Sequence, residues 1–379
     1  MQIPFASSPR SSLGIEWELE LVDLASRELH SAASEILDEL AGDAPEHPKA
    51  KHELLESCVE VITGVSGTVA EALLDLAATV AEVGDAAAAR GLGLMCSGTH
   101  PTTDWASQQI SPNPRYAQLV EDMQWLARRL QIFGVHVHVG VRSPDKVIPI
   151  VNALTAYIPH FLALSASSPY WIGTDTGLAS ARSKVFEGLP TAGVPYQLSG
   201  WDDFEQFMAT LISAQTIHSV REVWWDIRPH PTFGTVELRI CDGLPTLYEI
   251  RWAAALSQCL VEMLSTQLDR GYTLPVPKGW TVRENKWRAA RYGIDADVIV
   301  GEDGSTRPLR ELIGELVDEL SPIADRLECS EELQRAKQML DIGPSYLRQR
   351  RAAADADGKL TAVVDHLVAE MRAGRPVGS

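Results

Sequence analysis

Strict alternation of apolar and polar residues marks the first regular element of the chain. From Leu13 to Leu21, apolar side chains occupy the odd positions, whereas Glu16, Glu18 and Glu20 occupy even positions between them. Successive side chains of a β-strand point to opposite faces of its sheet. The alternation therefore predicts a strand with one apolar face for the core and one face that carries three carboxylates.

Three further segments and one short run show a similar division into an apolar and a polar face. Strands are predicted at residues 53–62, 133–141 and 235–242, and the short run covers residues 225–230. Strands that keep one polar face are typical of antiparallel sheets. The side chains predicted on the polar faces are Glu56, Cys58, Glu60, His136, His138, Asp226, Arg228, His230, Glu237 and Arg239.

Apolar residues recur at helical spacing between these strands. Residues 67–90 form one apolar face, for example at Val69, Leu73 and Leu76. The same spacing predicts helices at residues 113–131, 145–166, 201–219, 245–270, 308–328 and 355–373, whereas residues 271–279 contain two prolines and read as a loop. Amphipathic strands alternating with helices predict an α+β fold whose sheet has one face covered by helices and one polar face open.

The most apolar stretch, residues 147–166, is predicted to be a buried helix rather than a membrane span. Pro149, Asn152, Pro159 and His160 interrupt it. The first residues contain no apolar run typical of a secretory signal. The five cysteines are scattered and form no CxxC pair, which is typical of reduced thiols. We therefore expect a cytoplasmic protein.

Length and net charge narrow the range of functions. A chain of 379 residues can form one large domain or two intimate ones. We predict a single catalytic domain over residues 1–379, mostly helical after about residue 300. The formal net charge of −18 repels nucleic acid and anionic membranes, so neither is expected as a partner. It also repels ATP, so a phosphate site here would need its own cations, usually Mg²⁺.

Each polar strand, taken alone, has a simpler explanation. Three glutamates can be a solvated edge, a lone histidine is usually structural, and Glu237 with Arg239 can be a salt bridge. If the strands form one sheet, however, their carboxylates and imidazoles meet on a shared surface that suits Mg²⁺ or Mn²⁺ better than zinc. Arginine suits phosphate or carboxylate. The chain lacks P-loop, Rossmann, HExxH and GxSxG motifs, so a sheet-borne metal site remains.

A series of short motifs follows in order along most of the chain. They are Gly14-Ile15-Glu16-Trp17-Glu18, Glu53-Leu54-Leu55-Glu56 with Glu60, Ser97-Gly98-Thr99-His100-Pro101, Gly134-Val135-His136-Val137-His138-Val139, Ser168-Pro169-Tyr170-Trp171, Thr176-Gly177, Ala181-Arg182-Ser183, Trp225-Asp226-Ile227-Arg228-Pro229, Gly234-Thr235-Val236-Glu237-Leu238-Arg239 and the motif at residues 284–293. Together they resemble carboxylate–amine ligases of the glutamate–cysteine ligase type 2 family, within the glutamine-synthetase-like group.

The resemblance implies a curved, mainly antiparallel sheet that forms a funnel, packed by helices, with ATP at one mouth and its phosphates on Mg²⁺ ions. It also implies roles for individual residues. The implied metal ligands are Glu16, Glu18, Glu60, His136, His138 and Glu237, and the choice between the two histidines stays open. The implied catalytic residues are Glu237 and Arg239, and the implied substrate-binding residues are Trp171, Arg182, Arg288 and Arg291.

The implied reaction is amide formation through an acyl phosphate, with small-molecule carboxylate and amine substrates. Glutamate–cysteine ligation is one candidate, and another acid or amine fits the residues equally well. A metal-dependent amidase using the same Glu/His face is the alternative, and a non-catalytic binding protein is a third reading. The resemblance also makes a homo-oligomer a reasonable expectation. We further predict that Trp224 and Trp225 are packing residues and that Arg348-Gln349-Arg350-Arg351 is a solvated helix face or a local salt-bridge donor.

Overall fold

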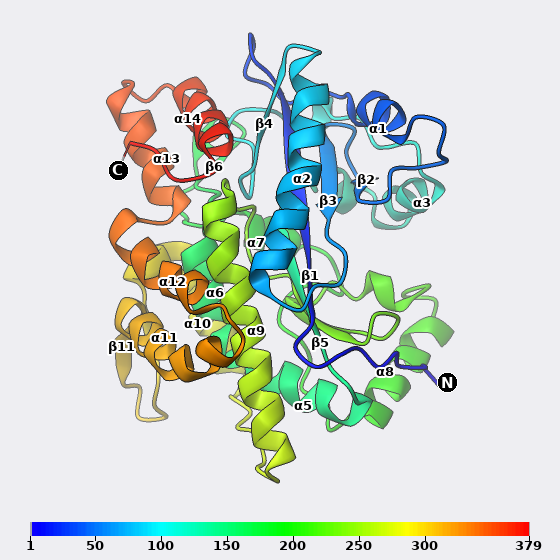
Figure 1. Cartoon of the computed structure of the whole chain (residues 1–379), viewed down its shortest axis with the longest axis vertical. Helices are drawn as coiled ribbons and strands as arrows, with labels where there is room; N and C mark the ends of the chain where they lie inside the picture. The colour runs from blue at the N-terminus through cyan, green and yellow to red at the C-terminus, as the bar shows by residue number, and fades with distance from the viewer. Residues whose placement is uncertain (1, 379) are drawn as a thin grey trace.

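A seven-stranded antiparallel sheet lies at the centre of the computed structural model, which describes residues 2–378 (Figure 1). The sheet is open, with β2 and β8 at its edges, so the expected α+β fold with an antiparallel sheet is confirmed. Its order is β2 (Ala50–His52), β3 (Cys58–Ile62), β1 (Leu13–Asp23), β5 (Val135–Gly140), β9 (Thr235–Leu238) and β8 (Ile227–His230), and β4 (Leu92–Met95) also pairs with β1.

The strand register places the polar side chains beside one another. Because side chains alternate along each strand, one matched pair fixes the face of every other residue on both strands. The cross-strand pairs are Glu16 with His136, Glu18 with Glu60, Glu20 with Cys58, His138 with Glu237, and Arg228 with Glu237. The expected convergence of the polar faces on one surface is therefore present in the fold.

Helices α2 (Val69–Ala88), α5 (Pro144–Leu154) and α9 (Leu247–Asp269) contact the sheet strands, and α2 and α9 cross in front of them in Figure 1. The odd-numbered residues of β1 from Leu13 to Leu21 are buried in the same apolar cluster as these helices. The indole nitrogen of Trp17 donates a hydrogen bond to the carbonyl of Leu244 at 3.0 Å. Burial of this face leaves the opposite face for polar residues.

Two predicted helices are broken in the structure. The segment at 113–131 divides into α3 (Pro114–Met123) and α4 (Trp125–Arg128), because Gln124 between them has a φ of 48°. The segment at 145–166 divides into α5 and α6 (Ile158–Ser165), which are joined by a 3₁₀ turn at Thr155–Tyr157. Apolar spacing continues across both breaks, so periodicity alone did not reveal them.

The remaining elements surround this centre. The predicted helices at 201–219, 308–328 and 355–373 correspond to α8 (Trp201–Ser213), α11 (Leu309–Arg326) and α14 (Leu360–Ala373), and residues 271–278 form a loop. Strands and α-helices missed from the sequence are β2, β4, α1 (Ala33–Ala41), α7 (Arg182–Phe186), α10 (Gly279–Tyr292), α12 (Ser330–Ile342), α13 (Ser345–Asp355), the small sheet of β6 (Tyr170–Trp171) and β7 (Thr174–Asp175), and that of β10 (Asp297–Ile299) and β11 (Thr306–Pro308).

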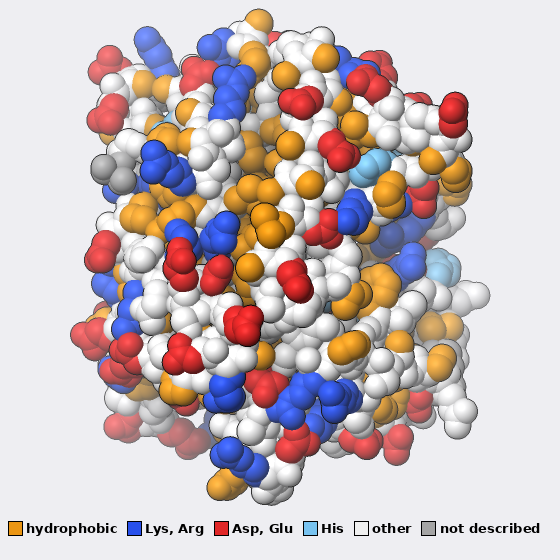
Figure 2. All heavy atoms as spheres, viewed as in Figure 1, with side chains coloured by type: hydrophobic (Ala, Val, Ile, Leu, Met, Phe, Trp, Pro, Cys, Tyr) orange, Lys and Arg blue, Asp and Glu red, His pale blue; other side chains and the backbone are white. Residues whose placement is uncertain are grey.

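The apolar stretch Pro144–Ser165 is long and apolar enough to cross a membrane, yet 83% of an apolar 18-residue window within it is buried inside the protein. Helix α5 packs on α9, and α6 packs on α10. The expectation of a buried helix is confirmed. The five cysteines are also buried and free. On the face drawn in Figure 2, acidic and basic side chains are interspersed rather than gathered by sign.

The prediction that residues 348–351 form a solvated helix face is wrong for Arg348. Its guanidinium is buried, bridges Glu249 on α9 and Glu370 on α14, and donates to the carbonyl of Gly343. The salt-bridge alternative holds, but both partners are distant in sequence. A local reading of four polar residues did not find them, because helices α13, α14 and α9 come together only in the folded chain.

Replacing Arg348 with alanine should lower the free energy of unfolding by about 3–5 kcal/mol, because two buried carboxylates lose their cation. Urea unfolding followed by circular dichroism measures the change. Arg351→Ala on the exposed side of the same helix is the matched control and should change stability by about 0.5 kcal/mol or less. Equal effects of the two substitutions would contradict a structural role for the buried ion cluster.

Candidate active site

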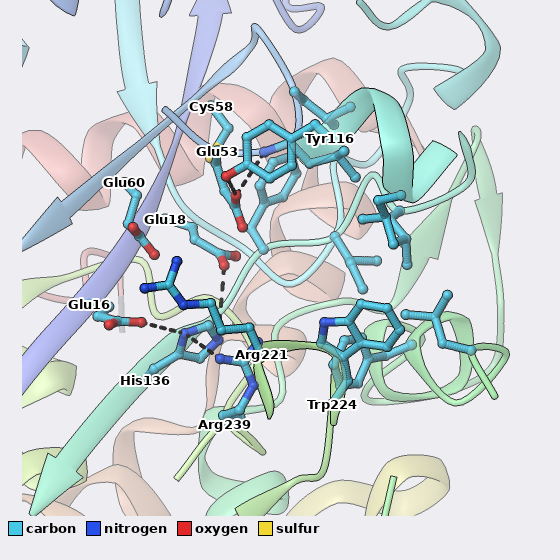
Figure 3. Close-up of a pocket in the computed structure, with 18 of the residues that line it drawn as sticks. Glu16, Glu18, Glu53, Cys58, Glu60, Tyr116, His136, Arg221, Trp224 and Arg239 are labelled. Atoms are coloured by element: carbon cyan, nitrogen blue, oxygen red, sulfur yellow. Dashed lines mark hydrogen bonds and ion pairs between the residues drawn. The ribbon is translucent and has the colours of Figure 1, made fainter. Parts of the chain in front are cut away.

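The polar face of the sheet forms one wall of a cavity of about 250 Å³ (Figure 3). Segments outside the sheet, including α3 and α7, supply the other walls. The polar residues that line the cavity from the strands are Glu16, Glu18, Glu60, His136, Arg228, His230 and Arg239. Strands β1, β3, β5 and β8, together with Arg239 directly after β9, thus deliver titratable groups to one cavity.

Glu16 lies at the centre of this group. Its two oxygens lie 3.1 Å from Nδ1 of His136 and 3.2 Å from Nε2 of His138. Two triplets have ligand atoms within 4.8 Å of one another, and Glu16 belongs to both: Glu16, Glu60 and His136, and Glu16, His138 and Glu237. Carboxylate oxygens with one imidazole nitrogen suit Mg²⁺ or Mn²⁺. Both predicted histidines therefore remain candidate ligands.

Glu18 and Glu60 face each other across β1 and β3 and crowd a third carboxylate, that of Glu53. Burial together with the charge of Glu53 raises the pKa of Glu18 to about 8. Burial and the charges of Glu16 and Glu53 raise the pKa of Glu60 well above its ordinary value. Negative groups in such contact favour a proton or a cation. The cluster is therefore electrostatically suited to a divalent ion.

Glu53 is a pocket residue that the strand pattern missed. It accepts a hydrogen bond from the hydroxyl of Tyr116 at 2.7 Å and lines the cavity. In the predicted strand 53–62, the alternation of side chains had placed Glu53 on the apolar face. In the structure β2 ends at His52 and β3 begins at Cys58, so the intervening turn resets the alternation. Its place in the Glu53-Leu54-Leu55-Glu56 motif was the available signal.

The same turn moves Glu56 away from the polar face, where the sequence had placed it. Its carboxylate accepts hydrogen bonds from the hydroxyl and the backbone N–H of Ser34, at the start of α1. Glu56 does not line the cavity in the described chain. Its function is therefore to hold the start of a helix.

Glu237 forms salt bridges with two arginines. Nε of Arg228 donates to Glu237 Oε2 at 2.6 Å, and Arg239 donates to Oε1. Burial alone would raise the pKa of Glu237. The charges of Arg228 and Arg239 outweigh burial and hold this pKa well below its ordinary value. The salt bridge suggested by the sequence is thus present, and it lies within the candidate site. Arg239 also lies 3.4 Å from Nδ1 of His136.

Arg182 enters the pocket from the first turn of α7. It is buried, its Nη1 lies 3.9 Å from Asp242, and its Nε has no hydrogen-bond partner among residues 2–378. A Cβ at Gly134 would lie 2.4 Å from Nη2 of Arg182, so glycine is needed there for the arginine to pass. The unused donor of a buried guanidinium can bind an anionic substrate group.

The other three predicted substrate-binding residues lie outside the cavity. Trp171 is half-buried in β6, Arg288 pairs with Glu284, and Arg291 donates to the carbonyl of Gly177. The motif at 284–293 instead contributes the buried Lys286. Its ammonium bonds both oxygens of Asp226, whose carbonyl accepts the backbone N–H of Arg239 at 2.8 Å. Lys286 thus supports the strand that carries Arg239.

Trp224 was assigned to packing alone, and that assignment is incomplete. Its side chain packs against Phe186 and Leu189, yet it also lines the cavity. Figure 3 shows Trp224 across the pocket from Glu16 and Glu60. Its neighbour Trp225 is fully buried, as expected of a packing residue.

Comparison with known proteins gives a consistent result. The family described as Glutamate-cysteine ligase family 2 matches residues 12–366. A protein of Frankia alni named "Putative glutamate--cysteine ligase 2-1" is 63% identical over 379 residues, which cover 100% of this chain and 99% of that protein. A protein of Thermobifida fusca named "Putative glutamate--cysteine ligase 2" is 56% identical, over 100% of this chain and 96% of that protein.

The fold also resembles a solved structure. A glutamate–cysteine ligase from Francisella tularensis, crystallised in complex with AMP, superposes with a TM-score of 0.70 at 13% identity. The superposition covers 97% of this chain and 90% of that chain. At this identity the likeness concerns the fold.

Glu20, the third carboxylate of β1, gives a prediction for pH. It accepts bonds from the N–H and hydroxyl of Ser97, its other oxygen has no partner in the described chain, and burial raises its pKa to about 8. A raised folded pKa means that the folded state favours the proton, so wild-type stability is lost as pH rises from 4.5 towards 8.

Glu20→Gln cannot ionise, so its stability relative to the wild type should increase between pH 5 and pH 8 and then level off. Urea unfolding across this range, with EDTA present, measures the difference. The exposed Glu121→Gln is the control and should run parallel to the wild type. Parallel curves for Glu20→Gln as well would contradict the raised pKa.

Metal binding gives a second prediction. Mg²⁺ or Mn²⁺ should raise the unfolding temperature, because an ion that binds only the folded state stabilises it. Glu16→Gln should reduce this shift more than Glu60→Gln, since Glu16 belongs to both triplets. Thermal unfolding at increasing ion concentration, with each variant compared with its own EDTA baseline, tests the order. An undiminished shift in Glu16→Gln would exclude both triplets as ion sites.

Proposed function

Because the chain belongs to glutamate–cysteine ligase family 2, it is an ATP-dependent ligase that forms carbon–nitrogen bonds, and we propose that the polar pocket of its sheet performs this reaction. One observation carries the proposal. Carboxylates, imidazoles and arginines from β1, β3, β5, β8 and the end of β9 converge on one cavity, with Glu16 shared by two candidate ion sites.

The chemistry explains why such a pocket is needed. A carboxylate is a poor electrophile, so the γ-phosphoryl group of ATP is first transferred to it, giving an acyl phosphate and ADP. The amine then attacks the carbonyl carbon, and phosphate leaves with its bonding electrons. Phosphoryl transfer depends on positioning and on neutralisation of charge more than on covalent help from the protein. A net charge of −18 makes local cations essential for holding ATP.

The residues divide this work. Glu16, Glu60 and His136 would hold one divalent ion, and Glu16, His138 and Glu237 another; Glu18 and Glu53 lie beside the first group. When bound, Mg²⁺ or Mn²⁺ neutralises the phosphate oxygens and polarises the transferred group. Arg239, held by Glu237 and next to His136, is placed to bind the phosphoryl group in transfer.

Arg182 is the proposed ligand for a substrate carboxylate. Its guanidinium is anchored on Asp242 and on the carbonyl of Arg239, and Arg182 lines the pocket beside Arg239 and Glu18. The names of the relatives make glutamate and cysteine the first pair to test. Phosphate release with ATP and Mg²⁺, measured over a panel of acids crossed with a panel of amines, identifies the substrates. Hydrolysis of an amide substrate with metal but without ATP would instead indicate a hydrolase.

Glu237→Gln should lower the rate of phosphate release by about a hundredfold or more, because it weakens an ion site and releases Arg239 from its partner. A thermal-unfolding check is needed, since two arginines lose their counterion. Glu60→Gln is the second variant, because Glu60 forms no salt bridge with an arginine in the described chain. It should show a comparable loss. Glu331→Gln, at an exposed position of α12, is the control. Wild-type rates in both pocket variants would refute this assignment of the site.

A further inference from the structure

The side of the pocket remote from the ion triplets is apolar. Six residues that line the cavity belong to one apolar cluster. We call them the apolar wall: Leu119, Leu130, Ile132, Phe186, Leu189 and Trp224. Figure 3 shows Trp224 on this side, across from Glu16, Glu60 and His136. The cavity therefore has two chemically unlike sides.

The apolar wall is built before any ligand arrives. Its members come from α3, from the segment before β5, from α7 and the turn after it, and from the segment before β8. Phe186, Leu189 and Trp224 are buried, whereas Leu119 and Leu130 are only half-buried and keep part of their surface open. Met123, Leu126 and Ala192 pack against the same cluster and support it. Such preformed apolar surface is typical of ligand pockets.

The base of the nucleotide has a better place beside the ion triplets. The rings of His230 and Phe233 stack with centroids 4.1 Å apart and planes 14° from parallel, and Phe233 is 51% exposed. Both residues line the cavity, and His138, a member of an ion triplet, meets both rings edge-on. A flat aromatic surface beside the phosphate site suits a purine. The apolar wall is then left for the other substrates.

Small zwitterionic amino acids fit the apolar wall poorly. Arg115 and Arg221 line the same cavity, are exposed, and have no carboxylate within ion-pair distance in the described chain. These cations can hold an anionic end of a substrate, whereas the side chains of the apolar wall suit an apolar group. A hydrophobic group that fills this surface removes it from water, which favours binding.

We propose that the apolar wall binds a hydrophobic group, aromatic or branched aliphatic, carried by the acid or by the amine that this ligase joins. The inference rests on the proposed function and adds the class of substrate. Burial of a side group of this size should raise kcat/KM by about tenfold to a hundredfold over the same substrate without it.

Phosphate release with ATP and Mg²⁺ tests the inference in two arms. The amine arm compares alanine with phenylalanine, and the acid arm compares propionate with 3-phenylpropionate; glutamate and cysteine are included in each. A preference of tenfold or more for the phenyl member of one arm is expected, and the arm identifies the substrate that carries the group. Turnover limited to glutamate and cysteine overturns the inference but keeps the ligase. No phosphate release with any pair removes the proposed function itself.

Variants separate the apolar wall from the base site. Leu130→Gln should lower kcat/KM for the phenyl substrate more than for its small counterpart, so that the phenyl preference falls about tenfold, and should raise the KM for ATP less than Phe233→Ala does. Phe233→Ala should raise the KM for ATP and keep the phenyl preference. If Leu130→Gln instead raised the KM for ATP and kept the phenyl preference, the apolar wall would bind the nucleotide base, and the inference would be overturned. Leu119→Gln repeats the test if Leu130→Gln unfolds.

Discussion

The structure depends on holding negative side chains against one another on one face of a sheet. Glu16, Glu18, Glu53 and Glu60 lie together in a largely buried space, where repulsion between like charges is much stronger than in water. Histidines at Glu16 and a backbone N–H at Glu18 offset part of this cost. The other face of the sheet offsets the remaining free-energy cost, because its apolar side chains are buried beneath α2, α5 and α9. A weaker core would not hold such a cluster in place.

The cations are distributed so that they support the cluster without filling it. Arg228 and Arg239 both pair with Glu237, and Arg182 is held by Asp242 from behind. Lys286 stabilises Asp226, next to the strand that carries Arg239, although its own helix lies outside the cavity. Consequently several carboxylates remain unpaired by arginine, which leaves them available to divalent ions. This division of charge is what an enzyme that transfers a phosphoryl group requires.

The cavity also has chemically distinct parts. The stacked rings of His230 and Phe233 contact His138 of one candidate ion site, and Trp224 of the apolar wall lies across the pocket from Glu16 and Glu60 (Figure 3). A reaction that passes a phosphoryl group from a nucleotide to an acid needs room for both partners beside the metal cluster. The fold provides two unlike surfaces because hairpin β8–β9 supplies the rings, whereas α3, α7 and the segments before β5 and β8 supply the wall.

The sequence by itself determined the faces of the strands. Alternation at 13–21, 133–141 and 235–242 is a local property of the backbone, so Glu16, His136, Glu237 and their neighbours could be assigned to one polar surface from the sequence alone. The motifs that resemble the ligase family likewise predicted the antiparallel sheet. Helix breaks at Gln124 and Thr155 escaped this reading, because apolar spacing runs through them.

Only the tertiary structure decided which distant groups meet. The turn between β2 and β3 brought Glu53 into the pocket and moved Glu56 out of it, and chain packing buried Arg348 between two helices. It also left Trp171, Arg288 and Arg291 outside the cavity and put Trp224 into its wall. The physical reason is that strand parity is set by adjacent residues, whereas contacts across turns and between helices depend on where the whole chain places them.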